Sequence, residues 1–500
     1  MVFNMFKGYE RVSSLDLVVC DALSIMVFED IAPEVMYEDL DRGLNGLLSK
    51  LRASGDLTGK EGEVLKLYLP EKPFKRLIIV GGGKTSELTK DRLRVFGGES
   101  VVRAKEMNLA SLCIALPKVN MSVEDVLYLV AEGAGLANYE WSRKKEVKLV
   151  KEIKFVGKEE ILKSCEVLDT VAKVVEAVNL GRDLANAPAD EINPQTFEEA
   201  VFKVFNGLPV KIKVLHKEDL EKLGMNGILS VGRGSNIPPR LIIVEYEGAG
   251  PDKPWYAVVG KGVCFDAGGL NLKDSSGMLE MKYDKSGAAY AVALAYAVAK
   301  LKLKVNLVVL TPLAENLPSG NAYKPLDIIR MYNGLTVEVR NTDAEGRLIL
   351  ADALSYAEKN YRLASIIDLA TLTGAVVVAL GSHAAGLFTN NEDLKNSLIK
   401  ASEETSERVW PLPLWREYYE DIKSDFADIK NIGVGRAAGA IIGAAFLSKF
   451  VEKTPWAHLD IAGIAWVQEE GPKKPYLSKG ATGFGVRLLL NFLKTASNTA

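Results

Sequence analysis

Charged residues gather in three segments of the second half of the chain, and two of these segments lie beside glycines directly after apolar runs. The segments cover residues 260–269, 281–284 and 341–348. Their carboxylates belong to Asp266, Asp284, Asp343 and Glu345. Four carboxylates in one place repel one another at neutral pH unless they are protonated, dispersed or neutralised by cations. The pattern therefore favours a site for divalent metal ions.

The last of these segments also predicts how its side chains are aimed. Asp343, Glu345 and Arg347 occupy alternate positions. If the chain stays extended after Arg340, all three side chains leave the same face of the strand. We therefore expect two carboxylates and a guanidinium to meet there. The alternative is a set of solvated surface acids with a salt-bridge network around Arg347.

Other common metal ligands are scarce. The three histidines, at positions 216, 383 and 458, form no HExxH pair, so a histidine-rich zinc site is not expected. The four cysteines contain no CxxC motif, which predicts neither a thiolate zinc site nor a disulfide framework and fits a reducing cytoplasm. The site must then use mainly oxygen ligands. Two-metal centres are built in this way, with ions about 3.5–4 Å apart that activate a water molecule.

Two other kinds of function fit parts of the sequence. Clustered carboxylates also serve two-metal phosphoesterases. A phosphate-binding loop is less favoured, because the GGGKT sequence at 81–85 follows Ile78, where the Walker pattern needs glycine. A formal charge of −3 and a pI near 6.0 argue against a general polyanion binder. A DNA-binding regulator is the minor alternative, and no nucleic-acid partner is expected.

The chain is too long for a single core. At 500 residues the length prior suggests two to four domains, and we expect two. We predict a smaller N-terminal α/β domain over 1–158, a connecting helix over 159–185 and a larger C-terminal α/β catalytic domain over 186–500.

Apolar runs alternate with helical stretches in the second domain. These runs cover 256–260, 306–310, 336–340 and 365–370. The stretch 286–300 between them is apolar almost all round, as a buried helix would be. The alternation predicts a mixed, largely parallel central sheet covered by helices on both faces. Chemistry is then expected at the carboxyl ends of its strands.

Neither a membrane span nor an export signal is predicted. The uncharged stretch 369–391 is long enough to span a membrane, but its glycines, threonines and His383 make it too polar. A buried strand, a loop and a second strand are expected there. Lys7, Glu10 and Arg11 lie where a secretory signal needs its apolar stretch. We therefore expect a cytoplasmic protein without membrane contact.

The octapeptide NTDAEGRL at 341–348 resembles the signature of the leucyl aminopeptidase (cytosol aminopeptidase) family. Four further segments resemble motifs of that family: VGKGVCFDAGG at 259–269, MKYD at 281–284, DLATLTGA at 368–375 and WAHLDIAG at 456–463. The resemblance covers nearly all of the second domain, whereas the first domain matches only in general character. It implies a metal-dependent aminopeptidase that acts on peptides with a free N-terminus, with a catalytic second domain and six copies assembled as a dimer of trimers.

The resemblance also implies ligands for two divalent ions, Zn²⁺, Mn²⁺ or Co²⁺. The ligand positions of the family fall on Lys261, Asp266, Asp284, Asp343 and Glu345, with Asp266 and Glu345 as the bridging pair. A lysine ligand must lose its proton before it can donate a lone pair. The alternative for Lys261 is an ordinary salt bridge to Asp266.

Two cationic residues correspond to catalytic positions of the family. Lys273 would polarise the scissile carbonyl and stabilise the oxyanion. Arg347 would hold a bicarbonate ion that takes a proton from the attacking water, because a planar guanidinium suits a planar carbonate. The alternative for Arg347 is a clamp on Asp343.

The resemblance places a pocket for the substrate's N-terminal side chain. Its residues are Met281, Asn341, Thr371, Leu372, Gly374, Ala462 and Ala465. Most of them are small or apolar, which predicts a preference for Leu-like or Met-like residues. Core packing is the alternative for Met281 and Leu372. His458 is expected to orient the sheet rather than to touch a metal.

Three positions depart from the family pattern. Ala267 stands where Ser or Thr is usual, and the loss of the hydroxyl is expected to loosen the surroundings of the ligands and shift metal preference. Lys285 replaces a frequently apolar residue and is expected to weaken the metal site at Asp284. Cys264 stands where Thr is common, and a thiolate ligand there is a minor alternative to a buried apolar residue.

Overall fold

The computed structural model describes residues 5–144, 146–468 and 474–499. The chain forms two compact units. Unit 1 comprises Met1–Asn179 and Lys473–Ser478, and unit 2 comprises Leu180–Pro472 and Lys479–Ala500. The division lies within helix α6 (Ser164–Asn186), which begins five residues after the start and ends one residue after the end of the expected connecting helix.

Unit 1 is an α/β sandwich around one sheet. The sheet runs in the order β1 (Phe6–Arg11), β6 (Glu152–Gly157), β5 (Ser111–Ala115), β2 (Ala22–Val27), β4 (Arg76–Gly81) and β3 (Val64–Tyr68). Only the pair β3–β4 is antiparallel. The inner strands β2, β4 and β5 are almost entirely apolar and buried, as parallel strands covered on both faces must be.

Two long helices of unit 1, α4 (Lys90–Glu106) and α5 (Val123–Ala137), pack against each other. Each begins at a capping hydroxyl: Thr89 accepts from the amide of Arg92, and Ser122 accepts from that of Asp125. The shorter helices are η2 (Leu15–Leu17), α1 (Pro33–Met36), α2 (Glu38–Gly43), α3 (Leu47–Ser54) and η3 (Thr85–Glu87).

The glycine turn after β4 is structural. The amide of Gly82 donates to the carbonyl of Val27 at 2.7 Å, and that of Gly83 donates to the carbonyl of Gly59 at 2.9 Å. Amides committed in this way do not face a phosphate, so the turn lacks the backbone donors of a phosphate loop.

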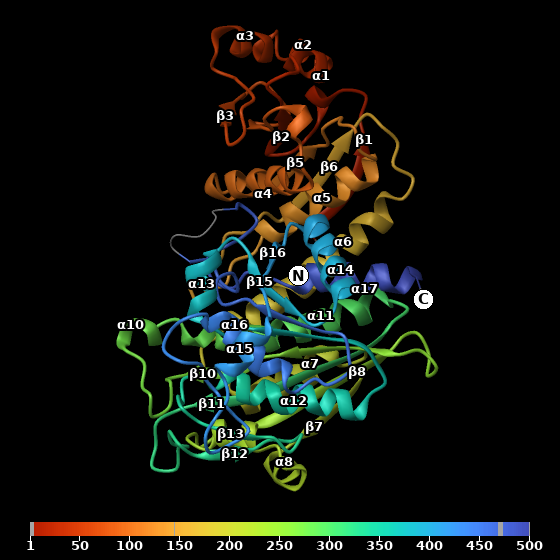
Figure 1. The fold of residues 1–500 in the computed structure, drawn as a ribbon. Helices are drawn as coiled ribbons and strands as arrows, with labels where there is room; N and C mark the ends of the chain where they lie inside the picture. The colour runs from red at the N-terminus through yellow and green to blue at the C-terminus, as the bar shows by residue number, and fades with distance from the viewer. Residues whose placement is uncertain (1–4, 145, 469–473, 500) are drawn as a thin grey trace. The chain divides into compact units, whose positions relative to one another are not determined.

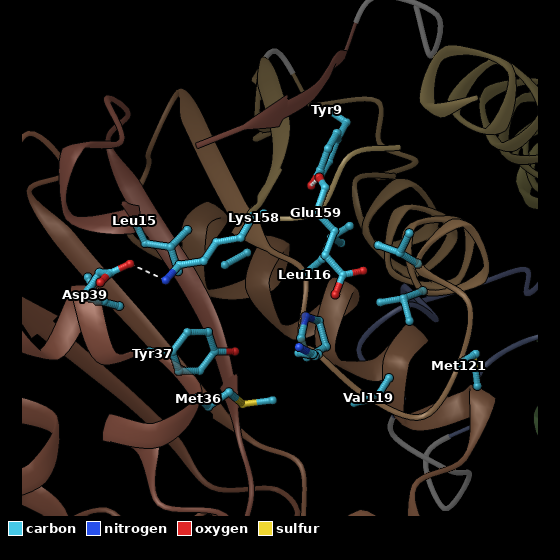
Figure 2. Close-up of a pocket in the computed structure, with 17 residues that line it drawn as sticks. Tyr9, Leu15, Met36, Tyr37, Asp39, Leu116, Val119, Met121, Lys158 and Glu159 are labelled. Atoms are coloured by element: carbon cyan, nitrogen blue, oxygen red, sulfur yellow. Dashed lines mark hydrogen bonds and ion pairs between the residues drawn. The ribbon is translucent and has the colours of Figure 1, made fainter. Parts of the chain in front are cut away.

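A cavity of about 200 Å³ lies at the carboxyl ends of β5 and β6 in unit 1. Figure 2 shows its largely apolar wall, with Tyr37 and Leu116 among the residues that line it. Lys158 forms an ion pair with Asp39 at its edge. None of the acidic segments of unit 2 contributes to this lining.

Unit 2 is built on a larger mixed sheet (Figure 1). Its order is β16 (Val409–Pro411), β15 (Ala385–Thr389), β18 (Trp456–Asp460), β14 (Leu363–Ala370), β9 (Trp255–Gly260), β11 (Asn306–Asn316), β8 (Arg240–Glu247) and β7 (Lys211–Leu215), with β10 (Gly262–Asp266) paired to the end of β11. The pairs β7–β8, β8–β11 and β15–β18 are antiparallel, and the others are parallel.

Helices cover both faces of this sheet. On one face, α11 (Ser286–Leu301) packs on β9, β11 and β14 together with α7 (Pro194–Phe205), α14 (Glu392–Thr405) and α17 (Val486–Thr499). On the other face lie α9 (Asn226–Gly232), α12 (Gly346–Asn360) and α16 (Gly439–Ser448), whose buried side chains share one hydrophobic core with alternate residues of β8, β9 and β11. The predicted fold class is therefore confirmed.

Two local expectations for unit 2 are wrong. The run 336–340 does not join the central sheet, because β13 (Thr336–Glu338) pairs with β12 (Ile328–Arg330) and β17 (Ile429–Lys430) in a separate small sheet. The stretch 369–391 contains helix α13 (Gly374–Leu380) between its two strands, since the hydroxyl of Thr373 caps that helix by accepting from Val376.

The remaining short helices are α8 (Lys217–Leu223), α10 (Ser275–Met278), η4 (Met281–Lys285) and α15 (Arg416–Glu420). Among all the helices in the described ranges, none combines the length and the apolar character needed to cross a membrane.

Candidate metal centre and active site

The predicted site residues lie at the carboxyl ends of neighbouring strands in unit 2. Lys261 follows β9 directly, Asp266 is the last residue of β10, and Thr371 follows β14. Asp284 lies in η4, the short turn that leads into α11. Parallel strands present their following loops at one edge of the sheet, and this edge therefore collects side chains that are far apart in the sequence.

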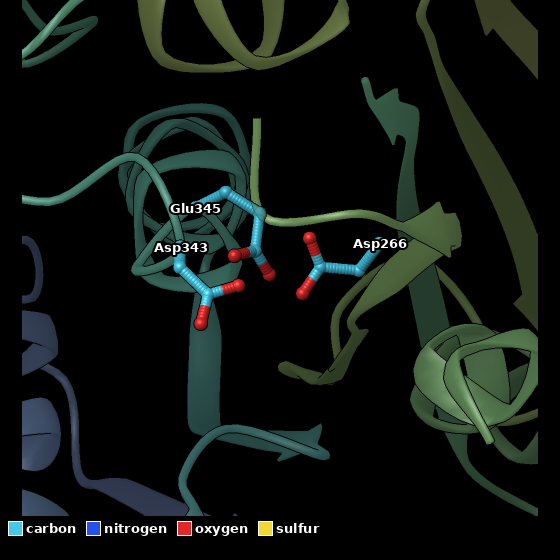
Figure 3. Close-up of side chains that lie close together, drawn as sticks. All are labelled: Asp266, Asp343 and Glu345. Atoms are coloured by element: carbon cyan, nitrogen blue, oxygen red, sulfur yellow. The ribbon is translucent and has the colours of Figure 1, made fainter. Parts of the chain in front are cut away.

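Three carboxylates meet at this edge. One oxygen each from Asp266, Asp343 and Glu345 lies within 4.8 Å of the other two, and Figure 3 shows the three groups facing a common point. Asp266 and Glu345 are 2% and 1% exposed, whereas Asp343 is half-buried.

Two lysines lie between the carboxylates. The ammonium of Lys261 lies 2.8 Å from Oδ1 of Asp284 and 2.9 Å from Oε1 of Glu345. The expected alternative partner, Asp266, is instead paired with Lys273 at 2.9 Å, and Lys273 also lies 2.5 Å from Oδ1 of Asp343. The two ammonium groups thus connect all four carboxylates of the three sequence motifs.

Burial and charge perturb these groups strongly. Burial raises the pKa of Asp284 to about 7 against the opposing charge of Lys261. Burial likewise raises the pKa of Asp343 to about 6. Burial disfavours both lysine ammonium groups, but the surrounding carboxylates outweigh it and raise the pKa of Lys261 and of Lys273.

The segment with Asp343 and Glu345 does not stay extended, so the expectation based on alternation is wrong. A turn precedes α12, in which the side chain of Asn341 accepts from the amide of Asp343 at 2.8 Å. Glu345 then has helical backbone angles (φ −78°, ψ −38°), and Arg347 lies in the first turn of α12. The two carboxylates converge because of this turn and not because of strand alternation.

Arg347 is not a clamp on Asp343. It is 6% exposed, and its Nη1 donates to the carbonyl of Asn431 at 2.7 Å. Its Nε is buried and has no hydrogen-bond partner among the described residues. Burial lowers the pKa of Arg347 to about 10. The guanidinium therefore keeps a donor that no group in the described parts of the chain uses.

The donor set fits divalent metal ions. Oδ2 of Asp284 and Oε2 of Glu345 are buried oxygens without a hydrogen-bond partner in the described parts of the chain. Lys261 pairs with the other oxygen of each carboxylate, so these two oxygens remain available to a divalent cation. Carboxylate oxygens suit Mn²⁺ and Zn²⁺ alike, so the residues present are compatible with two such ions.

The expected pocket residues follow the strands next to the carboxylates. Thr371 and Leu372 follow β14, and Ala462 follows the neighbouring strand β18. The hydroxyl of Thr371 donates to Oδ1 of Asp284 at 2.7 Å, and its carbonyl accepts from Lys261 at 2.9 Å. Thr371 therefore contacts the charged cluster directly.

The other expected pocket residues differ in exposure. Leu372 and Met281 are half-buried, and Gly374 is exposed at the start of α13. Asn341 uses its side-chain oxygen in the turn before α12. Ala465 is fully buried, and its carbonyl accepts from the hydroxyl of Tyr290 at 2.5 Å.

The three unusual residues are all buried. Lys285 directs its ammonium to the carbonyls of Ala187 and Lys282, both at 2.7 Å, and burial lowers its pKa to about 8. Burial raises the pKa of the Cys264 thiol to about 12, which disfavours a thiolate. Ala267 is 4% exposed directly after Asp266.

His458 contributes to the sheet. Its Nδ1 lies 2.5 Å from Oδ1 of Asp368, so the pair links β18 to β14. The ring stacks on Phe388 of the next strand, β15. This arrangement agrees with an orienting role for His458.

Several residues that hold the cluster were not expected. Asn316 donates to Oδ1 of Asp266 at 2.8 Å, and Asp460 accepts from the amide of Leu372 at 3.1 Å and from the hydroxyl of Thr373 at 2.7 Å. Asn316 could have been found, because it is a polar residue at the end of an apolar strand. Asn431, which lies in no recognisable pattern, could not.

Comparison with known proteins covers both units. The family model described as the cytosol aminopeptidase family, catalytic domain, matches residues 179–490. The model of the N-terminal domain of the same family matches residues 25–148. A probable cytosol aminopeptidase of Cenarchaeum symbiosum is 42% identical over 452 residues, which cover 90% of this chain and 92% of the relative. One of Geotalea uraniireducens is 42% identical over 487 residues, with 95% and 97% covered.

Solved structures agree with these matches. A mutant of tomato leucine aminopeptidase is 32% identical, with a TM-score of 0.88 over 98% of this chain and 96% of that one. The bottromycin maturation enzyme BotP in complex with Mn is 31% identical, with a TM-score of 0.85 over 96% and 100%. The chain therefore belongs to the cytosol aminopeptidase family, and by that membership it is a metal-dependent aminopeptidase.

Proposed function

We propose that this chain removes a Leu-like or Met-like N-terminal residue from peptides at a two-metal centre. The observation that carries the proposal is the convergence of three carboxylate oxygens within 4.8 Å, next to Lys261 and Asp284. Lys261, Asp266, Asp284, Asp343 and Glu345 would hold two divalent ions, Zn²⁺, Mn²⁺ or Co²⁺. When bound, such ions supply Lewis-acid activation of water and of the substrate carbonyl. Mn is bound in the similar structure of BotP, which supports this ion class.

Three cations of the chain take different roles in this proposal. Lys261 serves as a neutral amine ligand, which requires release of its proton when metal binds. Lys273 remains charged and stabilises the oxyanion of the reacting carbonyl. Arg347 holds a bicarbonate ion as general base through the buried Nε donor that no described protein group uses.

The substrate preference rests on the walls expected around the N-terminal side chain. Leu372, Met281 and Ala462 offer apolar surface. Each methylene of the substrate that is buried against such surface adds to the binding free energy. No charged side chain belongs to the expected pocket set, so acidic and basic N-terminal residues would lack a partner.

We further propose a cytoplasmic homohexamer. Large apolar side chains of unit 2 are strongly exposed, among them Leu272 at 60%, Leu279 at 77% and Phe426 at 75%. In the proposed hexamer, side chains of this kind would be buried between subunits, where they would form contiguous apolar surface. Light scattering after size-exclusion chromatography would give about six times the chain mass of 54.5 kDa, and a monomer would contradict the assembly.

The test of the activity is the release of nitroaniline from leucine p-nitroanilide. The metal-stripped protein should be inactive, regain activity with Mn²⁺, Zn²⁺ or Co²⁺, and fail to cleave the N-acetylated substrate. Glu345→Gln should lower kcat at least 100-fold with the fold intact by circular dichroism, whereas Glu392→Gln at an exposed position should not. Near-normal turnover by the Glu345 variant would refute the two-metal assignment. Cleavage of nitrophenyl phosphate without cleavage of the anilide would indicate a phosphoesterase instead.

A further inference from the structure

Asn431 lies directly after β17 and is fully buried. Its side-chain oxygen accepts from the amides of Arg340 at 2.8 Å and Asn341 at 3.3 Å. Its side-chain nitrogen donates to the carbonyls of Asn341 at 2.7 Å and Ala344 at 3.4 Å. Both donors and both acceptor positions of the carboxamide are thereby used.

All four bonds reach one short segment, residues 340–344, which connects β13 to α12. This segment contains Asp343 and leads directly to Glu345, two of the three converging carboxylates. The backbone of Asn431 extends the same attachment, because its carbonyl accepts from Nη1 of Arg347 at 2.7 Å and its amide donates to the carbonyl of Glu338 at 3.1 Å. One residue therefore holds the segment before, within and after the carboxylates.

The chemistry of this attachment requires a neutral carboxamide. An aspartate in its place would direct a charged oxygen at two carbonyl oxygens, and it would lose both donors. A serine could replace only part of the set, since a hydroxyl has one donor. A buried carbonyl or amide left without a partner is destabilising, so the segment would move to find other partners.

We propose that Asn431 is a positioning residue for the metal ligands, which sets the distance between the carboxylates of Asp343 and Glu345 and the placement of Arg347. This inference rests on the proposed two-metal function. It adds that metal affinity depends on a neutral side chain that bonds only to backbone groups beside the carboxylates. Loss of an orienting contact of this kind typically lowers metal affinity or activity by about 10- to 100-fold.

The test is calorimetric titration of the metal-free full-length chain with Mn²⁺, together with kcat and KM for leucine p-nitroanilide. Asn431→Asp should weaken Mn²⁺ binding at least 10-fold and lower kcat at least 10-fold. The matched control is Asn390→Asp, because the exposed Asn390 also accepts from a backbone amide (Trp456, 2.7 Å) and donates to a carbonyl (Thr454, 3.2 Å) away from this segment. The control should change neither quantity.

A merely structural role would lower the thermal midpoint of the metal-free protein without changing metal affinity, and that result would overturn the proposal. Asn431→Ser provides a neutral variant in case the buried aspartate prevents folding, and it should also weaken Mn²⁺ binding. Failure of both variants to fold would assign Asn431 to global stability and would equally overturn the proposal. If the wild-type chain binds no Mn²⁺, the proposed function itself fails. If the wild type and both variants bind Mn²⁺ equally well, only the proposed role of Asn431 fails.

Discussion

Asp352 offers a sharp test of how α12 is held in place. Its carboxylate is fully buried, two turns after Glu345 on the same helix. Oδ2 accepts from the amide of Ile228 in α9 at 3.1 Å, and Oδ1 accepts from the amide of Tyr332 at 2.9 Å. The perturbation is Asp352→Asn, which keeps the shape of the side chain, removes the titrating group and leaves an NH2 group against one of the two amides.

The magnitude follows from the pKa of this group. Burial raises the pKa of Asp352 from its ordinary value of 3.8 to about 7, although backbone amides oppose the shift. Between these values the unfolded chain has released the proton while the folded chain keeps it, so the stability of the wild-type fold falls as pH rises. At about 1.4 kcal/mol for each pKa unit, the loss reaches about 4 kcal/mol, of which about 3 kcal/mol falls between pH 5 and pH 8.

The assay is the thermal midpoint of the metal-free protein at pH 5 and pH 8. The Asp352→Asn variant should lose about 1–3 kcal/mol at both pH values through the mismatched amide. Relative to wild type, however, its midpoint should rise by about 3–5 °C between pH 5 and pH 8, because only the wild type carries the titrating carboxyl. Other carboxyl groups are common to both proteins and cancel in the difference. Asp393→Asn at an exposed position is the control. A difference that does not change with pH would refute the reasoning.

Two further substitutions test the cluster and its surroundings. Gly346→Ala would bring a Cβ into overlap with Cε of Lys261, so the lysine must move. We expect at least 10-fold weaker Mn²⁺ binding by calorimetry, with the thermal midpoint of the metal-free protein nearly unchanged. Normal Mn²⁺ affinity would contradict the role of Lys261 as a ligand. Lys285→Met removes the donor from the carbonyls of Ala187 and Lys282 and should lower the thermal midpoint by several degrees. Its Mn²⁺ affinity should stay within threefold, because the ammonium of Lys285 bonds to these carbonyls and not to a carboxylate of the cluster. An affinity change of 10-fold or more would show that this charge acts on the metal site.

The central strands could be predicted because burial on both faces makes them continuously apolar. β11 shows the limit of that signal. The apolar run predicts a strand that ends at Leu310, but the strand continues to Asn316. Pro312 interrupts the pattern and not the strand, because β11 pairs with β9 up to Leu310 and with β10 from Leu313 onward. The missing N–H of proline thus falls where the partner strand changes.

The residues of the candidate site could be predicted from the sequence, but their geometry could not. Charged residues beside glycines at strand ends identified the carboxylates, since side chains there are exposed to a common crevice. Their directions could not be predicted in the same way. Alternation predicts that Asp343 and Glu345 share a strand face, yet a turn stabilised by Asn341 and the first residues of α12 bring their carboxylates together. Alternate positions do not predict side-chain directions where a side chain, instead of a neighbouring strand, bonds to the backbone and forms a turn.

Apart from Lys261 and Lys273, the residues that hold the carboxylates share a property that sequence patterns do not record. Asn316 holds Asp266, Thr371 holds Asp284, and Asn431 holds the segment with Asp343. All three act through neutral donors. A lysine or arginine at these positions would also fix a carboxylate, but its charge would compete with a metal ion for the same oxygens. Neutral amides and hydroxyls orient an oxygen and leave its charge available, which is what a two-metal centre built from carboxylates requires. These neutral contacts therefore hold the carboxylates in place without adding to the ion pairs that Lys261 and Lys273 already make with them.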